Sequence, residues 1–283
     1  LYSVAFETED SASAEESVGS IFGYVIPFLM VSSILMGAMY PAIDTTAGEK
    51  ERGTLETLLT LPVSNLELII SKFLATTTIA IVAALLNVLS MGLLGGYFFQ
   101  SMQLGDSEVV FSLASYIPAI LLTLLCAVVF AMFASAVCLL VCIFAKSFKE
   151  AQNYSTPIMV VFMLSGMAGM IPGLELDGAI AFIPVINICL LIAKLFVFEF
   201  DINVILIVVL SNVLYSLIAV VIMSRVFSSE SILFSDGSEG IRIIEKRSDM
   251  KKNQIPGMGD VLLLFSILLI VLMLNFIIIV LVI

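Results

Sequence analysis

Six stretches of this chain, each roughly 20 residues long or longer, consist almost entirely of apolar side chains. A helix that crosses a bilayer needs about 20 such residues in a row. Charged residues make up 12% of the sequence, against about 25% in soluble domains. The sequence therefore predicts an all-α integral membrane protein, built as a polytopic helical bundle. The expected spans are Ile21–Ala42, Phe73–Phe98, Ile117–Ala145, Tyr154–Ile171, Ile202–Met223 and Met258–Ile283.

A seventh apolar stretch, Gly178–Phe198, is interrupted by Pro184 and carries Lys194. Acidic residues bracket it on both sides, so we expect an outward re-entrant helical hairpin at about 172–200 and not a full span. If the spans alternate and this hairpin does not cross, Lys194 is the single basic residue outside, among 12 in the sequence. The positive-inside rule supports that arrangement. It predicts a multi-pass protein of the cell (plasma or inner) membrane, with 1–20 ending an outward-facing segment and 43–72, 146–153 and 226–257 in the cytoplasm.

Several functional classes are excluded by composition. The chain has no His, which is the commonest metal ligand and general base, and we expect no catalytic or metal-binding residue. Its net charge of −11 argues against nucleic-acid binding. No clear span carries a charge at its middle, which disfavours a proton-coupled carrier. Asn87 and Asn212 are polar residues within spans; they either line a substrate path or form hydrogen bonds between helices.

A charged island lies between the first two spans and reads GEKERGTLETLLTLPVSNLELIISK, from Gly48 to Lys72. Thr46 and Glu49 have the spacing of a capping box, and so do Ser64 and Glu67. Three leucines recur at helical spacing between them, and Pro62 ends the pattern. We expect an amphipathic helix at about 46–61 across the cytoplasmic ends of two spans. Such a helix docks a partner, rests on lipid headgroups or closes the bundle as a plug.

The same string resembles the coupling-helix signature of ABC-2 type transporter permeases, most closely the branch that includes bacterial sodium-exporter permeases. The resemblance extends over the span layout from about Ile21 to Arg225, which we treat as the transmembrane domain (21–225). The family has six spans, so we expect the first to precede this sequence, which we take to be a fragment. The resemblance implies docking of a partner ATPase through Glu49, Glu51, Arg52, Gly53, Thr54, Leu55, Glu56, Leu58, Leu59 and Pro62.

That family implies a membrane subunit of an exporter, moving substrate out of the cytoplasm by alternating access. The sequence has no Walker A motif, so ATP and Mg are expected on a separate ATPase subunit, with no cofactor bound by this chain. A second permease half, identical or similar, would complete the path. Sodium, a drug, a peptide and a lipid all stay open as substrates.

The end of the sequence departs from the six-span pattern. A polar cytoplasmic linker is expected at 226–257, followed by the additional apolar run 258–283. Some relatives resemble fusions with a CPBP-type intramembrane protease, whose Glu-Glu and His motifs are absent here. Two alternatives to an exporter therefore stay open. One is the N-terminal part of such a protease fusion, and the other is a non-transporting membrane sensor or immunity protein.

Overall fold

The fold is known from a computed structural model that describes residues 14–60, 62–102, 117–171, 174–176 and 178–227. Every regular element among these residues is a helix, which confirms the predicted all-α class. The long helices are α1 (Ala14–Ile43), α4 (Asn65–Met102), α5 (Ile117–Cys142), α6 (Phe148–Gly166) and α8 (Ile202–Phe227). Shorter elements are η1 (Asp44–Gly48), α2 (Glu49–Glu51), α3 (Thr54–Leu59), η3 (Met167–Met170), η4 (Ile180–Phe182) and α7 (Ile186–Phe196).

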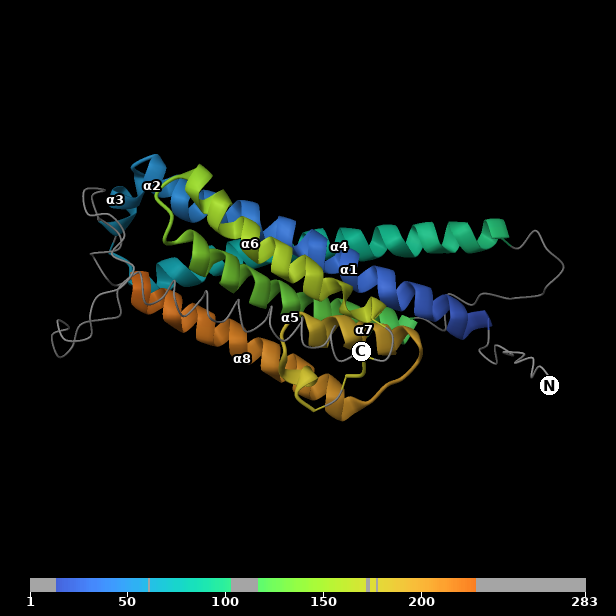
Figure 1. Ribbon diagram of the computed structural model, residues 1–283. Helices are drawn as coiled ribbons and strands as arrows, with labels where there is room; N and C mark the ends of the chain where they lie inside the picture. Colours follow the sequence, from blue (N-terminus) through green and yellow to red (C-terminus); the bar gives the residue numbers. More distant parts are fainter. Residues whose placement is uncertain (1–13, 61, 103–116, 172–173, 177, 228–283) are drawn as a thin grey trace, which may run out of the picture.

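The long helices lie side by side and run between two ends of an elongated bundle (Figure 1). One end carries α2 and α3 together with the C-terminal ends of α1, α5 and α8; we call it the α2–α3 end. Within the apolar part of α5, 78% of residues are buried, against 22% in α4 and 33% in α8. Helix α5 is therefore central, while α4 and α8 turn broad apolar faces outward, as expected of helices that meet lipid or another membrane subunit.

Four helices in the described residues are long and apolar enough to cross a membrane: Gly23–Glu51, Asn65–Leu94, Ile117–Cys142 and Ile202–Val226. They correspond to four of the predicted spans. The predicted span Tyr154–Ile171 forms most of α6 and η3 and also runs between the two ends (Figure 1). It does not meet the same criterion, because α6 begins with a polar stretch. The predicted span Met258–Ile283 lies outside the described residues.

The segment between α6 and α8 stays at one end of the bundle, opposite α2 and α3 (Figure 1). It contains η3, η4 and the buried helix α7, which packs against α1 and α5. Val185 and Phe198, with φ of 73° and 63°, bracket α7 in the left-handed region, where the backbone of a non-glycine residue is strained. The segment does not cross the bundle, in agreement with the predicted re-entrant hairpin.

The two predicted capping boxes have different outcomes. At the start of α4 the Ser64 amide donates to Glu67 Oε2 at 2.8 Å, and the Glu67 amide donates to Ser64 Oγ at 3.2 Å. This prediction is confirmed. The box at Thr46 and Glu49 is wrong, because no helix begins there: the Thr46 hydroxyl donates back to the Ala42 carbonyl, and α1 continues without a break through the π-helical turn η1. Helical Ser and Thr often bond backward in this way.

Candidate functional site

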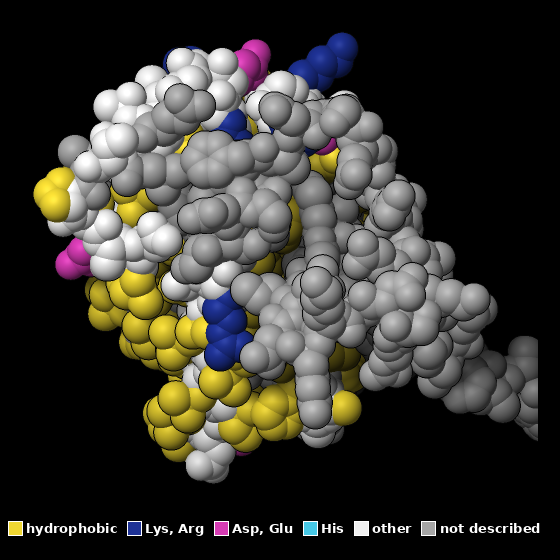
Figure 2. All heavy atoms as spheres, turned by 90° about the vertical axis from the view of Figure 1, so that its left-hand side faces the viewer, with side chains coloured by type: hydrophobic (Ala, Val, Ile, Leu, Met, Phe, Trp, Pro, Cys, Tyr) yellow, Lys and Arg dark blue, Asp and Glu magenta, His cyan; other side chains and the backbone are white. Residues whose placement is uncertain are grey.

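The α2–α3 end gathers most of the basic side chains in the part of the chain that the structure describes. Six of its seven Lys and Arg residues belong to segments at this end, and Lys194 on α7 is the exception (Figure 1). The six are Lys50, Arg52, Lys72, Lys146, Lys149 and Arg225. Figure 2 looks onto this end and shows basic and acidic side chains at the surface among uncharged ones. The charged island of the sequence lies here.

The sequence predicts one helix over 46–61. In the structure the island is instead divided at Gly53. Residues 44–51 continue the direction of α1 through η1 and α2, and α3 begins only at Thr54. Gly53 has φ of 70°, a conformation that glycine adopts without steric strain. A Cβ built on Gly53 would meet nothing within 4 Å. The glycine is therefore required by the backbone turn between α2 and α3, and not by close packing.

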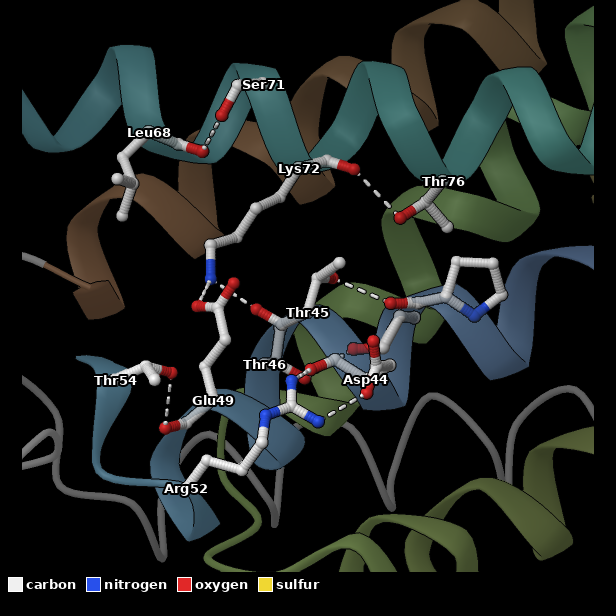
Figure 3. A network of polar contacts seen from close by, with 12 residues as sticks. Asp44, Thr45, Thr46, Glu49, Arg52, Thr54, Leu68, Ser71, Lys72 and Thr76 are labelled. Carbon is white, nitrogen blue, oxygen red and sulfur yellow. Dashed lines mark hydrogen bonds and ion pairs between the residues drawn. The ribbon is translucent and has the colours of Figure 1, made fainter. Parts of the chain in front are cut away.

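A buried ion pair joins this segment to α4. The Lys72 ammonium reaches from α4 to the Glu49 carboxylate and also donates to the Thr45 carbonyl (Figure 3). The two side chains are only 10% and 19% exposed. The ammonium therefore bridges η1 and α2 on one side and α4 on the other, and its charge is balanced where water has little access. The family resemblance predicts Glu49 in the docking surface, and nothing in the local sequence predicts its pairing with Lys72.

The next two residues bind two further helices. Lys50 donates to the carbonyl of Ile143, the first residue beyond α5. The Glu51 carboxylate accepts a hydrogen bond of 2.7 Å from the amide of Phe148, the first residue of α6. Lys50 thus places a positive charge at the C-terminus of α5, and Glu51 places a negative charge at the N-terminus of α6. Each charge interacts favourably with the dipole of the helix that it meets. Glu51 is therefore engaged within the chain, although the sequence placed it at the rim of a docking surface.

Arg52 forms a different kind of pair. Its guanidinium lies 2.8 Å from Asp44, and the side chains are 54% and 57% exposed. Asp44 raises the pKa of Arg52, chiefly through their hydrogen bond. Both residues belong to the continuous stretch from α1 to α2 (Figure 3), so this contact fastens no second helix. Water and salt screen an exposed pair of this kind, so it contributes little to stability.

The leucines predicted to face a partner are not equivalent. Leu55 is 5% exposed and belongs to the protein's own core, so it is occupied within the chain. Leu58 is half-buried, and the neighbouring Thr57, Thr60 and Pro62 are exposed. The side chains of Glu56 and Leu59 lie outside the described part. Among the side chains described on and just after α3, the half-buried Leu58 and its exposed neighbours are therefore the ones open at the surface.

The predicted substrate-path residues Asn87 and Asn212 lie in α4 and α8. Asn212 is fully buried, and its amide donates at 3.1 Å to Asn187 of α7. The Asn187 amide in turn donates to Ser211 of α8 at 3.2 Å. Asn212 therefore takes part in helix packing, the alternative role left open by the sequence. Asn87 Oδ1 and Asn212 Oδ1 are buried without a hydrogen-bond partner among the described residues.

A pocket of about 200 Å³ lies at the opposite end, between α1, η3 and α7. Neither Asn87 nor Asn212 lines it. Lys194 and Glu199 lie at its polar side, 3.8 Å apart, and leucines and other apolar side chains form most of the remainder. The structure thus separates this pocket from the buried amides of α7 and α8.

The described residues contain no group of three or more His, Cys, Asp or Glu side chains placed to hold a metal ion. The four cysteines are buried and free of disulfide bonds, and Cys142 Sγ lies 3.5 Å from Ser155 Oγ. They act here as small packing residues.

Long apolar helices, a charged end and a segment that re-enters without crossing define a polytopic helical membrane protein. Sequence comparison gives the family: the sequence model for ABC-2 family transporter proteins matches residues 3–278. The chain therefore belongs to the ABC-2 transporter family, as an ABC transporter permease. The match includes most of the final apolar run, which the sequence analysis treated as an addition to the family pattern.

One curated relative is the ABC transporter permease protein NatB of Bacillus subtilis (strain 168). It is 32% identical over 163 residues, which cover 55% of this chain and 40% of the relative. The matched stretch therefore spans less than half the length of that relative. No solved structure matches the chain significantly.

Proposed function

We propose that this chain is the membrane-spanning permease half of an ATP-driven exporter, and that its α2–α3 end docks a separate ATPase subunit. The observation that carries the proposal is the attachment of α2 to three other helices beside the partly exposed α3. A partner bound to α3 lies next to a segment that is fixed to α4, α5 and α6. Family membership supports the same role. ATP and Mg belong to the partner, and substrate leaves by alternating access.

A second permease half completes the path in this proposal. The support comes from α4 and α8, which carry rows of exposed large apolar residues along most of their length. Lipid covers part of such a surface, and a second copy of this chain or a similar permease covers the rest. The positive-inside rule assigns the α2–α3 end to the cytoplasm of the cell membrane, where an ATPase is available.

Docking is tested by copurification from mild detergent. Wild-type protein is expected to retain an ATPase subunit, whereas Leu58→Asp is expected to lose it, because a carboxylate replaces the partly exposed apolar side chain of α3. Gln152→Glu is the matched control, since it adds the same charge to an exposed position of α6 at the same end. Absence of an ATPase from wild type, or equal retention by Leu58→Asp, contradicts the proposed docking.

The orientation is tested by labelling single cysteines in a background with the four native cysteines replaced. An impermeant thiol reagent added to intact cells is expected to label Lys194→Cys and to leave Lys149→Cys unlabelled until the membrane is opened. The reverse pattern contradicts the proposed topology.

A substrate-flux assay separates an exporter from a sensor, because a sensor binds the ATPase without moving substrate.

A further inference from the structure

Three consecutive residues of α2 contact three different helices. Glu49 pairs with Lys72 of α4, Lys50 donates to the carbonyl just beyond α5, and Glu51 accepts from the first amide of α6. We call Glu49, Lys50, Glu51 and Lys72 the α2 clamp. Because the three contacts point to different helices, α2 cannot shift without disturbing all of them.

The clamp is specific in charge as well as in position. Lys50 lies at the C-terminus of α5, where a positive charge is favoured, and Glu51 lies at the N-terminus of α6, where a negative charge is favoured. Lys72 is 8% exposed as a whole residue, and its ammonium has both a carboxylate and a carbonyl as partners (Figure 3). A buried, fully paired charge holds its partners in one geometry, because any displacement leaves a charge unpaired.

Close packing extends the attachment from α2 into the bundle. Helices α1 and α4 approach each other at Gly37, where an added Cβ would lie 2.9 Å from Ala83 Cβ and 3.1 Å from Ala80 Cα. The same two helices are bridged at the α2–α3 end by Glu49 and Lys72, since α2 continues α1. Small residues along one side and an ion pair at the end fasten α1, α2 and α4 together.

Helix α3 is attached in a different way. Gly53 separates it from α2 by a left-handed turn. Its described contacts with the rest of the protein are the burial of Leu55 in the core and a 3.2 Å hydrogen bond from Thr54 Oγ1 to the Glu49 carbonyl. The surface open to a partner and the residues that reach α4, α5 and α6 are therefore on opposite sides of Gly53.

From this separation we infer that the α2 clamp, and not α3, transmits displacement from a docked ATPase to the membrane helices. In this proposal α3 supplies the surface that contacts the ATPase. Glu49 and Lys72 carry movement to α4, and Lys50 and Glu51 carry it to the turn between α5 and α6. These four are positioning residues. The inference rests on the proposed function and adds to it the residues that couple the two subunits.

The test uses the permease with its ATPase in proteoliposomes, and the double variant Glu49→Gln/Lys72→Met. This variant removes both charges together, so neither is left buried without a partner. The matched control is Lys149→Met, which makes the same lysine substitution at an exposed position of α6 at the same end and outside the predicted docking residues. The conformational probe is Phe182→Cys, 55% exposed at the opposite end, in the background without native cysteines.

Wild type and the control are expected to show an ATP-dependent change in the labelling rate of Phe182→Cys. The double variant is expected to bind the ATPase as wild type does and to show a change about ten-fold smaller, within the range typical of coupling between sites. A change as large as that of wild type, with docking retained, overturns the inference and leaves the proposed function intact. Failure of wild type to bind the ATPase overturns both.

Discussion

Lys72→Met is expected to destabilise the protein by about 3–5 kcal/mol, because it leaves the Glu49 carboxylate buried without its counter-charge. Glu49 is 19% exposed, and Lys72 supplies its ion pair. The Thr45 carbonyl loses a donor in the same variant. With about 2–4 °C per kcal/mol in a chain of this size, the apparent melting temperature in detergent should fall by about 10 °C.

The double variant Glu49→Gln/Lys72→Met is expected to recover most of that loss, because it removes the stranded charge together with its partner. The exposed pair of Asp44 and Arg52 gives the comparison. Arg52→Gln should change the melting temperature by little, since water and salt screen the charges of an exposed pair. Equal melting temperatures for Lys72→Met and Arg52→Gln would show that the Glu49–Lys72 pair is not buried in the folded protein.

Gly37→Leu is expected to disrupt the packing of α1 against α4. Even a Cβ at this position would lie 2.9 Å from Ala83 Cβ and 3.1 Å from Ala80 Cα, and the second of these atoms is backbone. Small residues permit such close helix approach in membranes. Overpacking typically costs about 1–3 kcal/mol, and sometimes more. We expect a melting temperature at least several degrees lower, or loss of the folded protein from the membrane fraction.

Gly92→Leu is the matched control for this prediction. Gly92 lies on α4 and is exposed, and a Cβ there meets nothing within 4 Å. The same substitution at this position should leave the melting temperature near that of wild type. If both glycine variants melt alike, the destabilisation is a general effect of leucine on these helices, and the close approach at Gly37 is not the cause.

The positions of the spans and the start of α4 were predictable because their sequence signals are local. Runs of apolar residues require a membrane or a core wherever they occur, and the reciprocal bonds of Ser64 and Glu67 involve residues three apart. The same local spacing at Thr46 and Glu49 gave a wrong prediction. There the apolar run of α1 continues into η1, so the Thr46 hydroxyl bonds backward and Glu49 turns to a residue 23 positions away.

The candidate docking surface was predictable as a segment but not residue by residue. Periodicity groups Leu55 with Leu58 and Leu59, yet Leu55 is buried in the protein's own core. Charge alone placed Glu51 at a rim, yet its carboxylate binds the first amide of α6, 97 positions along the chain. Nothing in the neighbouring residues signals either contact, because each depends on which helix ends meet at the α2–α3 end.

The sequence by itself determined that the protein is a helical membrane protein and that one charged segment stands apart, and it predicted the end at which six of the seven described basic residues gather. These properties follow from the transfer of side chains between water and lipid, which each residue contributes independently. Tertiary structure alone decided that Glu49, Lys50 and Glu51 bind three different helices, and that Gly37 brings α1 against α4. Those contacts depend on distance and direction in the folded bundle, which no single stretch of sequence contains.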